Sequence, residues 1–448
     1  EDAFRLARAT HRPSEAVMRE CVARAEGNPL YLDQLLRHAH EQGGDTVPGS
    51  IQSIIQSRLD RLSPMDRKAL EAAAILGQRF SMAEVMTVGR IEVYDERPLI
   101  DASLIRAHNN IYLFAHALIR DAVLRTMLRD DLRAQHRRAA EWFRPMDALR
   151  HAEHLAAAND EGAAAAFLAA ARDALAVHRK DAALELAERG LALAAQDAVR
   201  GDLLRLKGDM LRDLGRATDA IVAFEAASAI ALTPVDQCRS RIGIISAMRI
   251  LDRIDDAFAL LDETEAIASA ADLAPELSEI HYFRGSLHFP RGQLEGCLHE
   301  HALSLSYAER AGNAERRALA LSGLGDAHYA RGRMFTAHSV IQQCLALCEE
   351  HHLGAVEAAN RFMLATVKIY MNDTDSALAE ALASARLAQR VGLARAEIVS
   401  RLTAGWVLVS MGDAAAAQSQ VDQGLGLAAQ LGARRFEPFL KETVARIR

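Results

Sequence analysis

Strand-forming residues are scarce in this 448-residue sequence. Aromatic side chains make up 5% of it, although half of its residues are apolar, and alanine and leucine outnumber the β-branched residues. β-Branched and aromatic residues favour strands, whereas alanine and leucine favour helices. The composition therefore predicts a helical protein with few strands. Its length requires several domains or one core that is extended by repetition.

Disulfides and membrane spans are not expected either. The five cysteines are too few and too scattered for a disulfide framework, which is typical of proteins in a reducing compartment. No apolar run reaches the roughly 18 residues of a membrane helix, and no signal peptide is recognisable. We therefore expect a cytoplasmic protein without a membrane partner. The first residue is not methionine and both ends fall in helical sequence, so we expect a fragment of a longer chain.

Catalytic motifs are missing too. The dipeptide Gly-Lys never occurs, so the G-x-x-x-x-G-K-[ST] loop that holds nucleotide phosphates is absent. The nucleophile elbow G-x-S-x-G and the zinc-binding helix H-E-x-x-H are absent as well. We expect no ATP hydrolysis by this chain alone, and no cofactor bound to it.

The charge does not indicate a nucleic-acid surface. The formal net charge is −7, and residues 1–150 carry 22 basic and 21 acidic side chains. Proteins that bind DNA or RNA usually present a strongly basic face. Nucleic acid is therefore not the expected partner.

A repeat covers the second half of the chain. Its turn residues recur after 37 residues and then after every 40: Gly215, Asp252, Gly292, Gly332, Asn372 and Gly412. The positions seven before and five after each turn are mostly small: Gly208, Ile245, Gly285, Gly325, Ala365 and Gly405 before it, and Ala220, Ala257, Cys297, Ala337, Ala377 and Ala417 after it. Small side chains at fixed offsets let two antiparallel helices approach closely, and the turn closes the hairpin between them.

This small–turn–small order resembles the tetratricopeptide repeat, with longer helices because the period exceeds the usual about 34 residues. Six units lie between about 200 and 433, and a weaker one at 163–195 precedes them. A superhelix of such helix pairs offers a concave face to a protein or a small ligand. With the small residue placed eighth in each unit, the inward positions carry these candidate partner-binding residues: Arg205, Asp209, Arg212, Tyr282, Asp326, Tyr329, Phe362 and Trp406. The alternative is that these side chains only pack or lie in solvent.

Sharp punctuation marks the helices before the repeats. Gly27 and Asn28 tolerate a left-handed helix end, and Pro29 can begin the next helix at once. Further along, Ser63, Pro64 and Asp66 have the arrangement of a capping box. These signals predict short helices joined by tight corners.

The same region contains the one convincing hairpin of the sequence. Ser81 and Glu84 first open a short helix, and the segment "SLIRAHNNIYLFAH" then predicts two strands that turn at Asn109-Asn110. Helices followed by a two-stranded wing indicate a winged helix.

Three motifs resemble those of a known family. They are "AEGNPLYLDQLLRH", "VPGSIQSIIQSRLDRLSPMDRKALEAAAILGQRF" and "YLFAHALIRDAVLRTML", and the repeats follow them. In this order they resemble the part of STAND-class signalling ATPases that follows the P-loop domain, as in large LuxR-type transcription regulators and multidomain bacterial adenylate cyclases. The resemblance and the patterns above together predict an all-α fold. It comprises a helical lid remnant (1–46), a winged helix with one small β-hairpin (47–145) and a tetratricopeptide-type α-solenoid superhelix (146–448).

The resemblance also implies roles for single residues. In that family a G-x-P motif of the lid touches the adenine, and here this motif is Gly27-Asn28-Pro29. The place of His116 resembles that of a winged-helix histidine that reads the β-phosphate. ATP or ADP would bind the intact parent protein, next to its upstream P-loop domain. The alternatives are a plain helix–helix corner at residues 27–29 and a capping or buried structural role for His116. Arg120, one turn later, either assists or faces solvent.

Two clusters have the composition of metal sites. Cys344 and Cys348 share a helical face with His351 or His352, at a spacing that suits a soft metal. Because Cys344 falls at a packing position of its repeat, we favour buried structural cysteines. His151 and His154 are likewise assigned to packing or to the surface. Neither cluster shows a fourth ligand, so we predict no metal site.

The leading hypothesis is a regulatory and sensing fragment of a nucleotide-switched signalling ATPase. A protein or small-molecule signal would bind the superhelix, and the winged helix would couple binding to the ATPase. The resemblance also implies that the parent protein assembles into oligomers when activated. The alternatives are a free-standing interaction scaffold and DNA binding through the winged helix.

Overall fold

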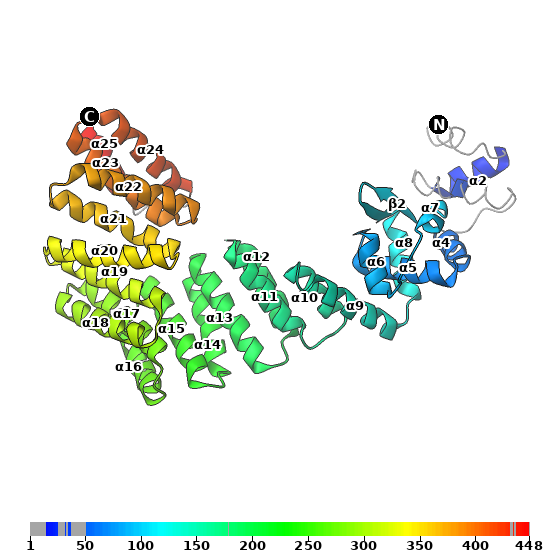
Figure 1. The fold of residues 1–448 in the computed structure, drawn as a ribbon, viewed down its shortest axis with the longest axis horizontal. Helices are drawn as coiled ribbons and strands as arrows, with labels where there is room; N and C mark the ends of the chain where they lie inside the picture. Colours follow the sequence, from blue (N-terminus) through cyan, green and yellow to red (C-terminus); the bar gives the residue numbers. More distant parts are fainter. Residues whose placement is uncertain are drawn as a thin grey trace. The chain divides into compact units, whose positions relative to one another are not determined.

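The computed structural model describes residues 15–25, 32, 35–36, 51–177, 179–430, 433 and 436–447. The motif Gly27-Asn28-Pro29 lies outside the described residues, so its contact with a nucleotide stays a prediction. The chain divides into two compact units, residues 1–170 and 171–448, and each is described here by itself (Figure 1). The predicted boundaries after residues 46 and 145 stay predictions.

The first unit consists of short helices around one small sheet. Its elements are α2 (Glu15–Ala25), α4 (Ile51–Asp60), α5 (Pro64–Leu76), β1 (Arg79–Phe80), α6 (Met82–Gly89), α7 (Arg97–Asp101), β2 (Ile105–His108), β3 (Ile111–Phe114), α8 (Ala117–Thr126), α9 (Arg129–Phe143) and α10 (Ala148–Ala157). The capping box predicted at Ser81 and Glu84 is confirmed. At Ser63 half of the predicted box is present: its hydroxyl accepts from the Asp66 N–H, and the Asp66 carboxylate accepts from that hydroxyl. The winged helix predicted from the hairpin is present.

The sheet has three strands, whereas the sequence predicted a two-stranded wing. The predicted hairpin is confirmed, because β2 pairs with β3 and Asn109 adopts a positive φ of 53° at the turn. On the other side of β3 the two-residue strand β1 adds Arg79 and Phe80 in antiparallel register, which gives the order β1-β3-β2. A strand of two residues is too short to produce an alternating pattern, so sequence periodicity did not detect it. Phe80 is buried at its end, with its ring centroid 5.4 Å from that of Phe114.

Three arginines close the ends of helices in the first unit. The last carbonyls of a helix have no partner within the helix. Arg120 Nε donates to the Ala74 carbonyl and Arg150 Nη2 to that of Leu76, both at the end of α5, while Arg138 Nε donates to a carbonyl at the end of α6. Arg120 therefore binds the neighbouring helix rather than facing solvent.

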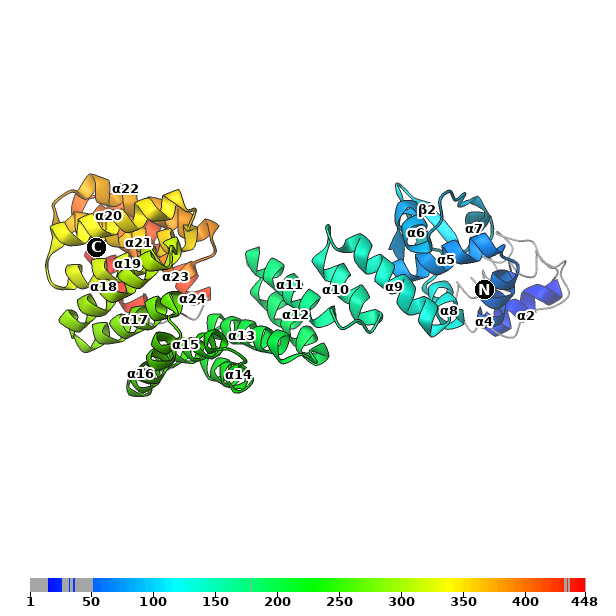
Figure 2. The ribbon, with the colours of Figure 1, turned by 60° about the horizontal axis from the view of Figure 1, so that its bottom comes forward.

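The second unit is a stack of antiparallel helix pairs in chain order (Figures 1 and 2). After α11 (Ala163–Ala176), which spans the division, come α12 (Lys180–Leu193), α13 (Asp197–Asp213), α14 (Ala217–Ala229), α15 (Pro234–Ile250), α16 (Ile254–Ala270), α17 (Ala274–His288), the 3-10 turn η1 (Phe289–Arg291), α18 (Leu294–Arg310), α19 (Ala314–Ala330), α20 (Met334–Glu350), α21 (Gly354–Tyr370), α22 (Thr374–Arg390), α23 (Ala394–Met411), α24 (Ala414–Gln430) and α25 (Glu437–Ile447).

All six predicted turn residues are in the left-handed region. Their φ values run from 58° at Asp252 to 81° at Gly412. After each of them the next N–H bonds to a carbonyl five residues back, as from Arg333 to His328, which is the hydrogen bond of a Schellman motif. The turns between units also contain left-handed residues, namely Asp272, Gly312, His352 and Gly392.

The turn within each unit and the turn between units together explain the long period of the repeat. Helices α18 to α22 each have 17 residues, and the turn after each has three. Two such helices with two such turns make a repeat of 40 residues, as the sequence shows. None of the described helices is both long and apolar enough to span a bilayer.

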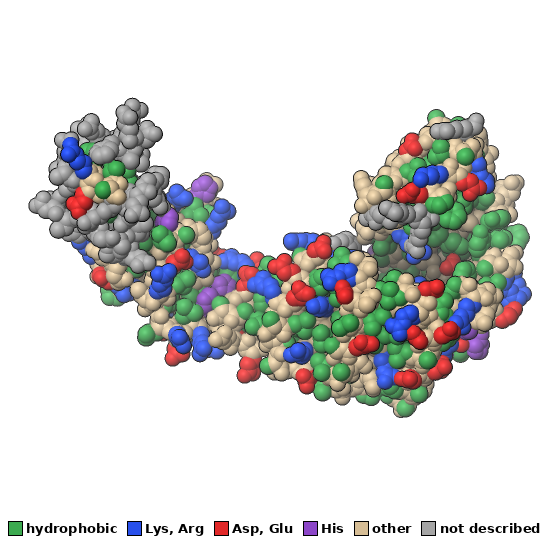
Figure 3. Space-filling view, turned by 180° about the vertical axis from the view of Figure 1, so that it is seen from behind, with side chains coloured by type: hydrophobic (Ala, Val, Ile, Leu, Met, Phe, Trp, Pro, Cys, Tyr) green, Lys and Arg blue, Asp and Glu red, His purple; other side chains and the backbone are tan. Residues whose placement is uncertain are grey.

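The first helices of successive pairs, α13 to α23 in odd numbers, contact one another along one side of the stack. The second helices of successive pairs have at most sparse contacts in the part of the chain that the structure describes. First helices that converge while second helices spread apart give the stack a concave side that is formed by the first helices. In the space-filling view the second unit, residues 171–448, has a hollowed side (Figure 3).

Candidate functional site

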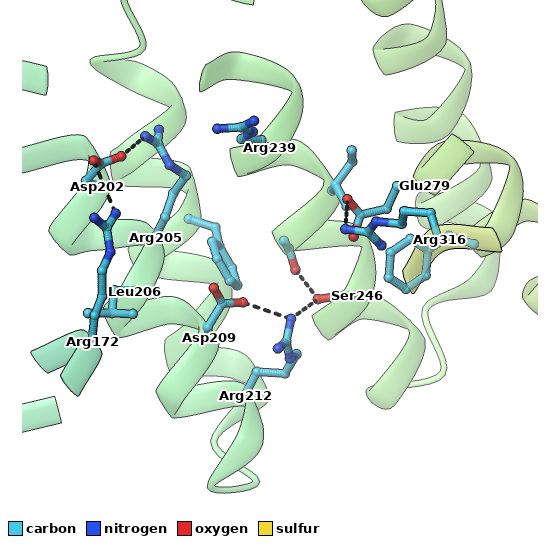
Figure 4. A pocket seen from close by; sticks show the side chains of 14 residues that line it. Arg172, Asp202, Arg205, Leu206, Asp209, Arg212, Arg239, Ser246, Glu279 and Arg316 are labelled. Carbon is cyan, nitrogen blue, oxygen red and sulfur yellow. Dashed lines mark hydrogen bonds and ion pairs between the residues drawn. The ribbon is translucent and has the colours of Figure 1, made fainter. Parts of the chain in front are cut away.

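A polar pocket of about 530 Å³ lies on the first helices α13, α15, α17 and α19 (Figure 4). It is lined by Arg172, Asp202, Arg205, Leu206, Asp209, Arg212, Phe224, Arg239, Ile242, Gly243, Ser246, Glu279, Phe283 and Arg316. Three of the predicted partner-binding residues, Arg205, Asp209 and Arg212, therefore come together in one site. The pocket volume is in the range of small-ligand sites, about 300–1,000 Å³.

The repeat register builds this pocket. Asp202, Arg239 and Glu279 occupy the second position of three successive units, and all three line the pocket. Within each repeat, the residue at the second position lies three residues before the residue at the fifth position. The two side chains are therefore on the same face of the helix. The inward positions predicted from the sequence begin at the fifth residue of each unit, so they do not include Asp202, Arg239 and Glu279. The i, i+3 spacing was the signal that could have found them.

Asp202 and two arginines form one side of the pocket. Arg205 pairs with Asp202 and, at 3.0 Å, with Asp236, and its side chain is 14% exposed. Arg172, from α11, reaches the other oxygen of Asp202 at 3.5 Å and is 60% exposed. Arg205 is therefore held by two carboxylates, whereas Arg172 has one long contact.

Arg212 connects α13 with α15. Its Nη1 atom lies 3.0 Å from Oδ1 of Asp209 and donates to the Ser246 hydroxyl at 3.0 Å, and its Nη2 atom contacts Asp213 at 3.1 Å. Loss of solvent around Asp209 exceeds the attraction of Arg212 and raises the pKa of Asp209 to about 6. This carboxyl group therefore changes its charge near neutral pH.

Glu279 and Arg316 form the other side of the pocket. The Arg316 Nη2 atom lies 2.7 Å from Oε2 of Glu279. Burial raises the pKa of Glu279, and the nearby guanidinium of Arg316 only partly opposes this. Figure 4 shows Arg239 between this pair and the Asp202–Arg205 group, at a distance from both.

The other predicted partner-binding residues do not line this pocket. Tyr282 is half-buried against the rings of Phe283 and His301, and Tyr329 packs beside Tyr370 with ring centroids 5.8 Å apart. Phe362 is half-buried. Trp406 is 39% exposed, and its Nε1 atom donates to the Thr443 hydroxyl of α25.

Asp326 has an unusual environment among these residues. Its Oδ1 atom is buried and has no hydrogen-bond partner in the described part of the chain. Burial raises the pKa of Asp326 to about 7. A carboxyl group with this pKa is half protonated near neutral pH.

His116 caps a helix. Its Nδ1 atom accepts a hydrogen bond of 3.1 Å from the Leu118 N–H at the start of α8. Because Nδ1 is the acceptor, a neutral ring carries its proton on Nε2. The capping alternative is thus what the structure shows, and it leaves the Nε2–H as a donor for a further ligand. The role of His116 toward a nucleotide stays a prediction.

The cysteine and histidine clusters take part in packing. Cys344 and Cys348 are fully buried in α20, and the Cys344 thiol donates to the Ala318 carbonyl, whereas His351 and His352 are exposed at the following turn. His154 is 8% exposed, and His151 contacts the Ala140 carbonyl through Nδ1. Among the described residues no three metal-binding side chains come together.

No family model matches the sequence, and no curated protein matches it either. Solved structures do match the fold. A STAND protein (signal transduction ATPase with numerous domains) with a tetratricopeptide repeat sensor, PH0952 from Pyrococcus horikoshii, is 14% identical. The match covers 99% of this chain and 68% of that chain, with a TM-score of 0.62. This chain therefore has the fold of a STAND protein with a tetratricopeptide repeat sensor over nearly its whole length.

Two further solved structures resemble this chain less closely. The apo form of RapI is 7% identical over 60% of this chain and 99% of that one, with a TM-score of 0.48. A tetratricopeptide repeat protein from Parabacteroides merdae is 13% identical over 63% and 98% of the two chains, with a TM-score of 0.42. The low identity of all three restricts the comparison to the fold.

Proposed function

We propose that this chain is the regulatory and sensing part of a nucleotide-switched signalling ATPase. The observation that carries the proposal is the polar pocket on the concave side of the repeats, since a pocket of this size and lining accommodates a signal molecule. The fold it shares with a STAND protein that has a tetratricopeptide repeat sensor supports the same reading. A ligand that fits one curvature of the superhelix better than another shifts the equilibrium between conformations.

In this proposal the winged helix couples the repeats to an ATPase domain ahead of residue 1. ATP or ADP binds that domain, Gly27-Asn28-Pro29 lies against the adenine, and the Nε2–H of His116 donates to a phosphate oxygen. The hydrogen bond from Leu118 supports this role because it directs the donor nitrogen away from the helix. The intact protein would act in the cytoplasm and assemble into oligomers when activated.

The test begins with the reading frame upstream of Glu1. A P-loop ATPase domain that ends there is the expected result, and a start codon immediately before Glu1 refutes the nucleotide switch. In the protein with its P-loop domain, ADP affinity should fall in His116→Asn, which keeps a capping side chain, and not in His108→Asn, which changes an exposed strand residue. Equal ADP affinity in both variants would remove His116 from the proposal.

A free-standing interaction scaffold is the second candidate. Exposed aromatic side chains favour it: Phe335 is 79% and Tyr370 63% exposed, and such residues often anchor protein partners. DNA binding is disfavoured, because Arg120, Arg138 and Arg150 of the winged-helix unit are engaged with helix carbonyls. A gel shift with duplex DNA that weakens steeply with salt would reverse this ranking.

A further inference from the structure

We propose that the pocket on α13, α15, α17 and α19 is an anion site in which Arg239 and Arg316 bind the carboxylate or phosphate group of a small ligand, in competition with the protein's own carboxylates. This inference rests on the proposed sensor function and names the chemistry of its signal. Nothing in the repeat pattern requires five arginines at one place. Arg205, Arg212 and Arg316 bridge neighbouring helices, whereas Arg239 has donors that no contact with a described helix uses.

The arginines that line the pocket differ in how many of their guanidinium N–H groups are not already bonded to a carboxylate of the protein. Arg205 is surrounded by carboxylates, as described above. Arg239 is 58% exposed, and of its guanidinium only Nε is engaged, at 3.1 Å from the buried Glu276. Its two terminal nitrogens have no hydrogen-bond partner among the described residues, and Figure 4 shows the group facing the pocket without a dashed contact. A planar guanidinium whose two terminal nitrogens are available as donors matches the geometry of a carboxylate or phosphate.

Asp209 and Glu279 have the opposite role. Each is the pocket-lining partner of an arginine, Arg212 and Arg316 respectively. An incoming anion would meet their negative charge at close range. The site can accept it by protonating these two carboxyl groups, which releases the guanidinium donors to the ligand. The pKa of both groups is already raised, that of Asp209 to about 6, so their protonation needs less further change than that of an ordinary carboxyl group.

The charged neighbours of both groups come from four helices. Asp209 has Arg212 and Asp213 on α13 and Glu279 on α17, whereas Glu279 has Glu276 on its own helix, Arg316 on α19 and Arg212 on α13. Arg239 of α15 lines the same pocket. Since an added negative charge raises the pKa of a nearby carboxyl group, anion binding is expected to take up protons and to tighten as the pH falls from about 8 to about 6.

The apolar part of the lining sets the shape of the ligand. Leu206, Ile242, Phe224 and Phe283 line the pocket along with the charged residues. This combination suits a compact molecule with an acidic end and an apolar body. The same chemistry occurs in a free organic acid or phosphate ester and in the carboxyl terminus of a peptide, so the test includes both sources.

The experiment is isothermal titration of the full chain with citrate, inorganic phosphate, and a short peptide with either a free or an amidated carboxyl terminus. We expect binding of at least one of the anions, about tenfold weaker in the Arg239→Gln/Arg316→Gln double variant. Arg253→Gln is the matched control, because Arg253 also pairs with an acidic residue but does not line the pocket. A free peptide that binds while its amide does not identifies a chain end as the source.

The second variant tests the competition directly. In Asp209→Asn/Glu279→Gln the amides imitate the protonated carboxyl groups, so anion affinity should rise at about pH 8 and lose its pH dependence. A purely structural role of these residues would not increase affinity. The proposal is overturned if no anion binds, if the arginine double variant and the Arg253 control lose affinity equally, or if the amide variant binds more weakly.

The outcomes also separate this inference from the proposed function. Anion binding that leaves the nucleotide affinity of the protein with its P-loop domain unchanged supports the site and contradicts the switch. Nucleotide affinity that responds to a partner, in a protein whose pocket ignores every anion, supports the switch and overturns the anion site.

Discussion

The ring of Phe224 lies against Gly208 of the same helix pair so closely that a Cβ atom at Gly208 would fall 2.7 Å from the ring edge. The ring also meets Gly243 of the next pair, where a Cβ atom would fall 2.5 Å away. His301 repeats this arrangement two units later between Gly285 and Gly323. A glycine at the small-residue position and a second glycine two residues before that position in the next unit thus make room for a ring from the second helix.

The first prediction concerns this contact. Gly208→Ala should destabilise the repeat unit by about 1–3 kcal/mol, because the methyl group overlaps a buried ring that cannot move away. Gly201→Ala in the same helix is the matched control. Its Cβ atom would lie 3.6 Å from the nearest atom, an ordinary contact, so helix propensity should make this variant about 0.5–1 kcal/mol more stable.

Urea denaturation measures both variants. The protein has two tryptophans, Trp142 in the first unit and Trp406 in the second, so in a Trp142→Phe background the fluorescence reports on the repeats. Equal stability of the Gly208 and Gly201 variants would contradict the ring-and-glycine contact.

The second prediction concerns acid sensitivity of the first unit. Nδ1 of His136 lies 3.0 Å from Nδ1 of His154, and burial lowers the pKa of each to about 4, with Arg120 and Arg150 nearby adding to the effect. A pKa that is lower in the folded than in the unfolded chain means that the unfolded state binds more protons. The contribution of the pair to stability is therefore complete above about pH 6.5 and is lost as the pH falls toward 4.

His136→Asn keeps a polar atom near the position of Nδ1 and removes one titrating group. We expect it to reduce the loss of stability between about pH 6.5 and 4.5 by roughly half, because one of the two titrating groups is gone. Trp142 fluorescence in a Trp406→Phe background follows the unfolding of this unit. The exposed His108→Asn should leave the pH dependence as it is. An unchanged slope in the His136 variant would show that the pair does not cause it.

The third prediction separates the two roles of His116. Removal of the cap in His116→Ala should destabilise the first unit by about 1 kcal/mol, whereas His116→Asn, with another good capping residue, should not. The measurement is again urea denaturation followed through Trp142. If the alanine variant were as stable as the chain without the substitution, the hydrogen bond from the Leu118 N–H to His116 would contribute nothing to the stability of the folded state.

The fourth prediction concerns Asp326. Its pKa of about 7 is higher than in an unfolded chain, so the folded state binds the extra proton. The contribution of this group to stability is therefore complete below about pH 4 and is lost progressively as the pH rises from there to about 7. Asp326→Asn removes the buried charge and should stabilise the second unit by about 2 kcal/mol more at pH 8 than at pH 5.

Thermal unfolding at the two pH values provides the test. The control is Asp422→Asn, which changes an exposed carboxylate that only accepts from Gln418 one turn away. A stabilisation of the same size at pH 5 would contradict the raised pKa and would indicate a packing effect instead.

The sequence predicted the local structure better than the site. Gly292 and Asn372 tolerate a positive φ for reasons that belong to the residue itself, so the turns and the 40-residue period were predictable. The strand β1 was not, because its pairing with β3 depends on residues far away in the sequence. Two of the candidate partner-binding residues show this. Arg212 lines a pocket, whereas Trp406 is hydrogen-bonded to Thr443, although both occupy inward positions of their repeats.

Position within a repeat specifies the face of the helix but not the neighbour across it. Arg316 reaches the pocket from α19, outside the inward positions of its own unit, because its long side chain extends to Glu279. Such contacts depend on side-chain conformation and on the spacing of adjacent pairs. Neither property is local to the sequence, which is why the pocket required the structure.

The ring-and-glycine contacts also have a mechanical consequence. At Phe224 and at His301 one side chain is wedged between two neighbouring first helices, so sliding of one pair over the next meets steep repulsion. At the equivalent place in the fifth unit the ring is replaced by the small side chain of Ala381, which packs with Ala365 and Ala404. The stiffness of the superhelix is therefore expected to differ along its length. Under an applied force it should deform first between α21 and α23.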